Sequence, residues 1–236
     1  MHHVLVDQWS HGATALHKRD PRAKILALLV FLIVLATTPA NAAVTLTIDA
    51  ALLLAGILIA GLPMGNLLLR AAAVLPFSLT FGFISWLVGD SLRAIGLVEK
   101  SYLSTVAVLL LVGTTPLPVL LGGLESLGAP RLLVLVAQFL YRYLFVISEQ
   151  AQHFRLAAAC RQGPPGKHRR SRFRAAAGAL AVLFARSYYR AEGIHRAMMS
   201  RAFGGHFRLL SPLRFRAVDG FFAAAIAAFL ILVRVQ

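Results

Sequence analysis

Long apolar runs alternate with short polar or Pro- and Gly-containing breaks along most of the chain, and this pattern predicts a bundle of membrane helices. Pro39, Pro63 and Pro130 stand in such breaks, and Pro116 and Pro118 share another. Proline ends or bends a helix because it lacks a backbone N–H. The runs expected to cross a membrane are residues 25–38, 44–62, 71–89, 102–113 and 218–233.

The polar residues between the runs predict where helices begin and end. Asp20 can cap a helix that has Pro21 in its first turn. Asp49, one charge in an apolar run, is expected at the membrane interface. The other expectations are a cytoplasmic link at 66–70, an external loop at 90–100, a stop at 163–166, a solvated loop at 167–172 and a helix at 173–201 that Gly204 and Gly205 terminate.

Residues 131–162 predict one long helix, since they contain neither Pro nor Gly. Its first half is apolar apart from Gln138 and Arg142, and its second half is polar and basic. If every apolar run before the basic region crossed the membrane, that region would lie outside the cell, against its charge. We therefore expect Leu132–Ile147 to lie along the cytoplasmic face, or to dip and return. A fourth run too weak to cross would satisfy the charge equally well.

Composition agrees with a membrane protein, because 58% of the residues are hydrophobic and only 14% are charged. Soluble domains are about 25% charged. Fourteen of the 24 Lys and Arg residues lie between His153 and Arg216, where Glu192 is the one acidic residue. A charge at mid-bilayer costs at least about 2.5 kcal/mol, so this block is expected in water on the cytoplasmic side. In a membrane protein, a basic block of this kind indicates the cytoplasmic side and a surface for partner docking rather than nucleic-acid binding.

These features together predict an all-α integral membrane protein with about five transmembrane helices and long cytoplasmic helices. We expect no cleavable signal peptide, because acidic and histidine residues precede the first run. The predicted segments are a cytoplasmic N-terminus (1–24), a transmembrane domain (25–127), a cytoplasmic or membrane-surface coupling domain (128–217) and a last transmembrane helix (218–236).

Two long helices in the basic region share one design, and they are the candidate functional elements. Each starts apolar, becomes cationic and ends in a short Arg-centred tripeptide. Small residues around one Arg let a helix end enter a groove while the guanidinium reaches a carboxylate or carbonyl oxygens. The candidate tripeptides are Cys160, Arg161, Gln162 and Ser200, Arg201, Ala202. The candidate supporting residues are Arg142, Glu149, Arg186, Arg190 and Glu192.

Catalytic and metal-binding motifs are missing from the sequence. It has no GxxxxGK[ST] motif for ATP phosphates, no HExxH, no CxxC and no GxSxG. Its single cysteine, Cys160, excludes an internal disulfide. The eight histidines fit solvated surface positions better than a metal site, because no pair at helical spacing has a third ligand beside it.

The order and spacing of several motifs resemble the T component of energy-coupling factor transporters, in particular its cobalt and nickel branch, the CbiQ type. The resemblance covers almost the whole chain. It rests on Leu16–Lys24, on the Thr114-Thr115-Pro116 stretch with Gly123 and Gly128, on Tyr141-Arg142-Tyr143 with Glu149, on Arg186–Glu192 followed by Ala197–Gly205, and on Arg208–Arg214.

The resemblance implies a non-catalytic coupling subunit of an ATP-driven importer, in a bacterial inner membrane with its N-terminus in the cytoplasm. The two tripeptides would dock on two ABC-type ATPase subunits, which carry the ATP and Mg²⁺, while this chain binds no cofactor and no metal. A substrate-capture membrane subunit (the S component), with a small accessory membrane protein, would complete the complex. Both tripeptides keep the central Arg but depart from the family's usual Ala-Arg-Gly or Ala-Arg-Ser. The alternatives are a vitamin-specific or shared energy-coupling module, and a scaffold that binds anionic lipid.

Overall fold

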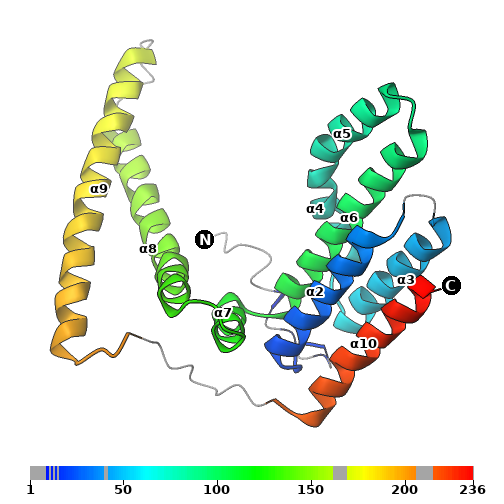
Figure 1. Cartoon of the computed structure of the whole chain (residues 1–236). Helices are drawn as coiled ribbons and strands as arrows, with labels where there is room; N and C mark the ends of the chain where they lie inside the picture. The colour runs from blue at the N-terminus through cyan, green and yellow to red at the C-terminus, as the bar shows by residue number, and fades with distance from the viewer. Residues whose placement is uncertain are drawn as a thin grey trace. The chain divides into compact units, whose positions relative to one another are not determined.

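The computed structural model describes residues 9, 10, 12, 14, 16–39, 42–161, 169–205 and 215–235, and every regular element among them is helical (Figure 1). This confirms the predicted all-α fold. The chain divides into two compact units. Unit 1 comprises residues 1–128 and 209–236, and unit 2 comprises residues 129–208. The four segments predicted from the sequence concern placement in a membrane and stay a prediction.

Unit 1 is a helical bundle whose buried core lies among α2 (Pro21–Thr37), α3 (Ala43–Ala60), α6 (Ser91–Thr114) and α10 (Ala217–Val235). The tightly buried side chains include Phe31, Leu35, Leu53, Ile57, Val106 and Leu230. Lipid is as apolar as leucine, so close packing rather than exclusion of water must hold such helices together.

The ends of α2 and α3 follow from their sequences. Asp20 caps α2 as predicted, since its Oδ1 accepts a hydrogen bond from the Arg22 N–H at 2.9 Å and Pro21 occupies the first turn. At the end of α3, Gly61 has a φ of 65°, and its N–H donates to the last carbonyls of the helix. This left-handed conformation favours glycine.

The predicted cytoplasmic link at 66–70 is wrong, because these residues are helical. They belong to α4 (Met64–Ala71), which a 3₁₀ turn, η1 (Ala72–Val74), joins to α5 (Leu75–Leu87). Pro76 explains the turn. Its nitrogen has no hydrogen with which to bond the carbonyl four residues earlier, and its ring would clash with that carbonyl. The chain therefore forms a tighter 3₁₀ turn before Pro76 instead of a loop.

The predicted external loop at 90–100 is also wrong, because α6 begins at Ser91 and contains these residues. Asp90 caps the helix by accepting from the Arg93 N–H at 3.3 Å. With no proline to stop them, the charged residues form the first turns of the helix instead of a loop. α5 and α6 pack together along much of their length (Figure 1).

The breaks near Pro116 and Pro130 are confirmed. α6 ends at Thr114, and the short helix α7 (Leu117–Ser126) follows. A Cβ atom at Gly123 would lie 3.2 Å from the Cβ of Pro21 and 3.3 Å from the Cδ1 of Ile25, so α7 approaches the start of α2 closely. A side chain at this position would require Pro21 or Ile25 to shift by a few tenths of an ångström.

Unit 2 consists of the two longest helices, α8 (Arg131–Arg161) and α9 (Arg169–Ser200), which pack against each other (Figure 1). The prediction of one helix over 131–162 is confirmed to within a residue. The second helix begins four residues earlier than predicted and ends at Ser200, before the glycines at 204 and 205. The predicted stop at 163–166 lies outside the described residues, as does most of the predicted loop at 167–172.

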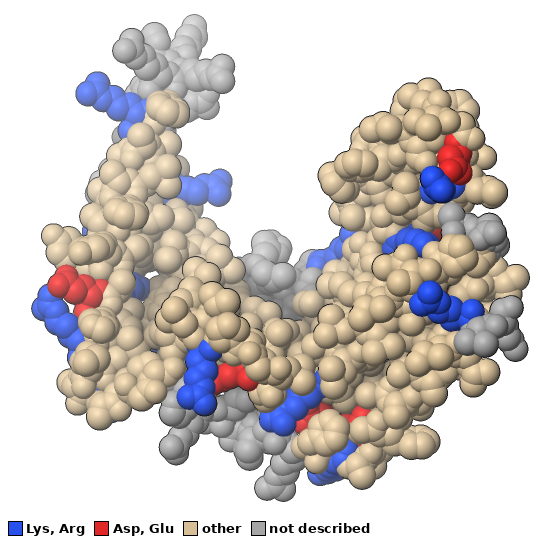
Figure 2. All heavy atoms as spheres, in the orientation of Figure 1, with Lys and Arg blue, Asp and Glu red and all other residues tan. Residues whose placement is uncertain are grey.

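Within the described part of the chain, four helices are long and apolar enough to cross a membrane: Met64–Leu87, Ser91–Thr114, Arg131–Cys160 and Ala217–Arg234. At most 22% of the most apolar stretch of each is buried within the structure, so most of that apolar surface needs lipid or a partner. The space-filling view accordingly shows long uncharged areas with Lys and Arg in separate small groups (Figure 2). The surface placement predicted for Leu132–Ile147 stays a prediction, since α8 also suffices to cross.

Asp49 is enclosed by the protein, and its predicted position at the membrane interface stays a prediction. Its side chain is buried at 1% exposure, and neither carboxylate oxygen has a hydrogen-bond partner among the described residues. α3, which carries Asp49, contacts both α6 and α10, an arrangement that the sequence of one helix does not reveal.

Candidate functional site

α8 and α9 form an antiparallel pair, and the contacts between them set the level of each candidate residue. The Arg186 guanidinium lies over the Phe154 ring, 5.2 Å from its centroid. A cavity of about 370 Å³ lies between α8 and α9, beside this contact and nearer the start of α8 and the end of α9. Its lining comes from Phe139, Tyr143, Ile147 and Gln150 on α8 and from Ser187, Arg190, Ala191 and Ile194 on α9. Higher residue numbers on one helix therefore face lower numbers on the other.

The antiparallel arrangement places the two candidate tripeptides at opposite ends of unit 2. Arg161 lies seven residues beyond Phe154, and Arg201 lies fifteen residues beyond Arg186 in the other direction. At about 1.5 Å per residue, the two positions lie roughly 33 Å apart along the helix axes. This separation is about the diameter of a small domain, so two separate domains could each take one end.

The second tripeptide forms the end of α9 and is fully exposed. The Phe203 N–H donates to the Met198 carbonyl and the Ala202 N–H donates to the Met199 carbonyl, each at 3.1 Å. This pair of bonds is a Schellman motif, in which Arg201 is the C-cap of α9 and Ala202, the next residue, is left-handed. Ala202 has a φ of 51°, a conformation that glycine adopts without strain.

The helix end presents Arg201 to solvent. Its side chain is exposed and makes no ion pair within the described part of the chain. Ser200 is also exposed, and its Oγ donates to the Ala197 carbonyl at 3.0 Å. A guanidinium at a helix C-terminus with free donors can bind a carboxylate or carbonyl oxygens of another protein.

The first tripeptide lies at the end of α8 and is only partly described. Cys160 is exposed and is a free thiol. Arg161 is the last residue of the helix, and Gln162 lies outside the described residues. The structure thus brings the backbone of Arg161 to a helix end, as the sequence predicts.

The five predicted supporting residues fall into two groups. Arg186 and Arg190 lie at the contact between α8 and α9. The other three interact within their own helix: Arg142 lies over the Tyr143 ring at 5.8 Å, Glu149 lies 4.0 Å from the imidazole of His153, and Glu192 pairs with Arg196 at 2.6 Å. Arg142 and Glu149 do not pair with each other among the described residues, since Glu149 faces His153.

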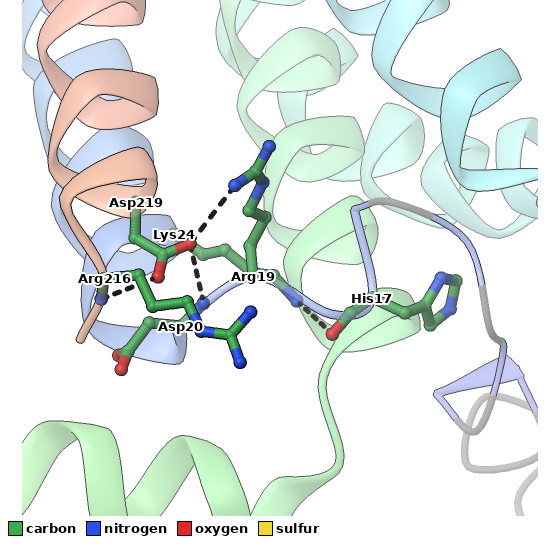
Figure 3. A network of polar contacts seen from close by, with 6 residues as sticks. All are labelled: His17, Arg19, Asp20, Lys24, Arg216 and Asp219. Atoms are coloured by element: carbon green, nitrogen blue, oxygen red, sulfur yellow. Dashed lines mark hydrogen bonds and ion pairs between the residues drawn. The ribbon is translucent and has the colours of Figure 1, made fainter. Parts of the chain in front are cut away.

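Sequence reasoning missed a buried polar network in unit 1 that centres on Lys24 (Figure 3). The Lys24 Nζ donates to the Thr114 carbonyl at 3.0 Å, to the Thr115 Oγ1 at 2.9 Å and to the His17 carbonyl at 3.4 Å. Three acceptors match the three donors of an ammonium group. The network thereby ties the start of α2 to the end of α6.

Lys24 precedes the apolar part of α2, which begins at Ile25. Burial lowers the pKa of its ammonium group to about 8, although the carboxylates of Asp20 and Asp219 oppose this effect. At neutral pH the group is therefore still protonated and donates all three bonds.

Asp219 joins the first turn of α10 to the same network. Its Oδ2 accepts from the Arg216 N–H at 3.1 Å, as the third residue of a helix does in a capping box. Its Oδ1 accepts from the Asp20 N–H at 3.5 Å and lies 3.6 Å from the Arg19 guanidinium. Asp219 therefore places a negative charge in the first turn of α10 and also contacts the residues that precede α2.

A signal for this network was present in the sequence. Lys24 lies in one of the motifs that carry the family resemblance and Thr114 and Thr115 lie in another, and the structure shows them bonded to each other. Two motifs far apart in the chain that both contain polar residues can indicate a contact, although neither motif alone shows which residues it contacts.

Comparison with known proteins agrees with these features. The family model described as cobalt transport protein, CbiQ, matches residues 12–211. The cobalt transport protein CbiQ of Rhodobacter capsulatus is 31% identical over 185 residues, which cover 78% of this chain and 72% of the relative. An uncharacterized protein of Methanocaldococcus jannaschii is 30% identical over 107 residues, which cover 45% of this chain and 39% of that protein.

Proposed function

Because the chain belongs to the CbiQ family of cobalt transport proteins, we propose that it is the transmembrane coupling subunit of an ATP-driven energy-coupling factor importer. Its membership makes it a multi-pass membrane component of cobalt transport that works in a complex. The proposal adds the division of labour within that complex. ATPase subunits hydrolyse ATP, a separate membrane subunit captures the substrate, and this chain transmits motion between them.

One observation supports the proposal most: unit 2 has two Arg-ended helices whose ends lie roughly 33 Å apart along the helix axes at about 1.5 Å per residue. Two ATPase subunits would each receive one end. Arg161 would enter the groove of one subunit and Arg201 that of the other, where charge-assisted hydrogen bonds to carboxylates or carbonyls hold them. The dense basic block fits this role, since docking surfaces for acidic grooves carry positive charge.

The mechanism follows from helix stiffness. α8 and α9 have 31 and 32 residues without a proline, so a displacement at either end moves the whole helix. When ATP binding brings the two ATPase subunits together, the arginine ends approach or tilt with them. The exposed apolar side chains of α9, among them Leu180 and Phe184, would pass this motion to the substrate-capture subunit.

This chain itself would hold no nucleotide and would catalyse no reaction. The sequence lacks a phosphate-binding loop, so ATP and Mg²⁺ would bind to the partner ATPases. The described residues include no group of three His, Cys, Asp or Glu side chains that could hold a metal ion. Both facts support a coupling role in which the transported ion meets another subunit.

The substrate we favour is Co²⁺, after the family, with Ni²⁺ as its closest chemical alternative. A small accessory membrane protein would complete the complex, in a bacterial inner membrane with the N-terminus in the cytoplasm. A vitamin-specific or shared module remains the second candidate. Uptake of radioactive cobalt, nickel and vitamins by cells that express the complete complex distinguishes these substrates.

Co-purification tests the docking proposal. The variant Arg161→Glu with Arg201→Glu should lose the ATPase subunits during affinity purification, because each reversal places a carboxylate where a cation binds. The double variant Arg155→Glu with Arg174→Glu is the matched control, since it changes the same amount of charge at exposed positions of the same helices. Equal recovery of ATPase with wild type and with the Arg161 and Arg201 variant would refute the docking sites. ATPase lost equally in both double variants would show that overall charge, rather than the helix ends, binds the partner.

A further inference from the structure

A cavity of about 330 Å³ lies inside unit 1, among α2, α3, α6 and α10. Its lining is apolar except for Arg19, Lys24 and Thr114. All three polar residues belong to the end of the bundle where α2 and α10 begin and α3 and α6 finish. The cavity is therefore polar at one end and apolar along its length.

The apolar part extends well into the bundle. Phe31 lies seven positions after Lys24 on α2, and Ala107 lies seven positions before Thr114 on α6. All four residues line the cavity. At about 1.5 Å per helical residue, the cavity reaches roughly 10 Å beyond its polar end. An apolar space of this length suits a hydrocarbon chain better than a polar solute or an ion.

Arg19 is the cation at the polar end that can bind a ligand. The three donors of Lys24 are already matched by three acceptors. Arg19 has one long ion-pair contact, at 3.6 Å to Asp219, and its side chain is 31% exposed. Its guanidinium also lies 5.9 Å from the centroid of the Phe222 ring, which lines the same cavity. Figure 3 shows this side chain pointing away from the Asp20 carboxylate.

We propose that this cavity binds one acyl chain of an anionic phospholipid, with the lipid phosphate on Arg19. The apolar length takes the chain, and the guanidinium takes the phosphate through paired hydrogen bonds. The exposed Lys18 beside Arg19 favours a headgroup of net negative charge over a zwitterionic one. The site lies wholly in unit 1 and does not depend on ATPase docking.

The test is native mass spectrometry of the delipidated full-length chain in detergent, with equal amounts of phosphatidylglycerol and phosphatidylcholine added. The wild type should retain one phosphatidylglycerol, at about a tenfold excess over phosphatidylcholine. Both lipids carry the phosphate, but Arg19 and Lys18 repel the choline cation, and each cation near the headgroup contributes about 1 kcal/mol to the preference for net negative charge. Arg19→Gln should lose the excess. Ala55→Phe, which fills the cavity with the charges intact, should lose the bound lipid.

Two variants provide matched controls. Arg93 is also paired with an aspartate, Asp90, but lies away from the cavity, so Arg93→Gln should keep the lipid. Leu54 lies next to Ala55 but does not line the cavity, so Leu54→Phe should also keep it. Retention by Arg19→Gln and Ala55→Phe at the wild-type level would overturn the proposal, as would equal retention of phosphatidylcholine by the wild type. Displacement of phosphatidylglycerol by an equal concentration of fatty acid would overturn the assignment to a phospholipid.

Discussion

At the scale of the residue, the turn that ends α9 exposes the Arg201 side chain and reduces the stability of the helix end. The Schellman motif turns the chain at Ala202, directly after the exposed Arg201. Ala202 stands where the related motif has glycine or serine, and its φ of 51° is strained for a residue with a Cβ atom. The departure of this tripeptide from the family pattern therefore has a physical consequence that can be measured.

The variant Ala202→Gly should stabilise the end of α9 by about 1 kcal/mol, because glycine removes the left-handed strain. Amide hydrogen exchange at Phe203 should slow correspondingly. Ala197→Gly is the matched control, since it places the same substitution within the helix, where it should destabilise by about 1 kcal/mol. Faster exchange in Ala202→Gly than in the wild type would contradict the assigned turn.

Arg201 should need its guanidinium as well as its charge. We expect Arg201→Lys to weaken binding to the purified ATPase subunit about tenfold, because lysine cannot form the paired bonds of a planar fork. Binding is measured with the full-length chain in detergent. Arg196→Lys, which changes an exposed arginine already paired with Glu192, should bind normally. Wild-type affinity in Arg201→Lys would show that charge alone suffices.

At the scale of the element, the network around Lys24 explains how the helices of unit 1 meet at one end. One ammonium group bonds to the end of α6 and to the chain before α2, and Asp219 brings the first turn of α10 to Asp20. The bonds hold these elements at their termini, where backbone groups lack partners within the helix.

The variant Lys24→Met should therefore lower the free energy of unfolding by about 1–3 kcal/mol, the usual cost of leaving buried acceptors without a donor. Thermal unfolding in detergent provides the measurement. Lys18→Met serves as the control, because Lys18 lies in the same segment but is exposed. Equal stability of Lys24→Met and wild type would mean that water or lipid headgroups replace the ammonium group without loss.

Close packing of α7 on α2 yields a further prediction at this scale. Gly123→Leu should destabilise unit 1 by about 1–3 kcal/mol, since its side chain must displace Pro21 or Ile25. Gly178→Leu is the control, because Gly178 lies at an open position of α9. Gly128→Leu is unsuitable, because Gly128 has a φ of 104° that would strain any residue with a side chain. Unchanged thermal unfolding of Gly123→Leu would indicate that α7 does not pack on α2 in the membrane.

At the scale of the whole molecule, the apolar pattern predicted the helical class and most helix ends, because proline and glycine act locally. It failed at 66–70 and 90–100, where polar and charged residues predict connections between helices but lie inside helices. The two arginine-ended helices could also be predicted, because their ends depend on residues that are close together in the sequence. The Lys24 network and the burial of Asp49 were not, since both depend on contacts between segments far apart in the chain.

The account as a whole requires the arginine ends of unit 2 to face the cytoplasm, where ATPase subunits can reach them. Cys160 is the one cysteine of the chain, is exposed, and precedes Arg161 directly. A membrane-impermeant maleimide therefore reports on this end without any substitution.

We predict that the reagent labels Cys160 in inside-out vesicles and leaves it unlabelled in intact spheroplasts. Bound ATPase subunits should protect it. In the variant with Cys160→Ser and Ser200→Cys, the other end should behave in the same way. Labelling of either position in spheroplasts would contradict the proposed coupling role.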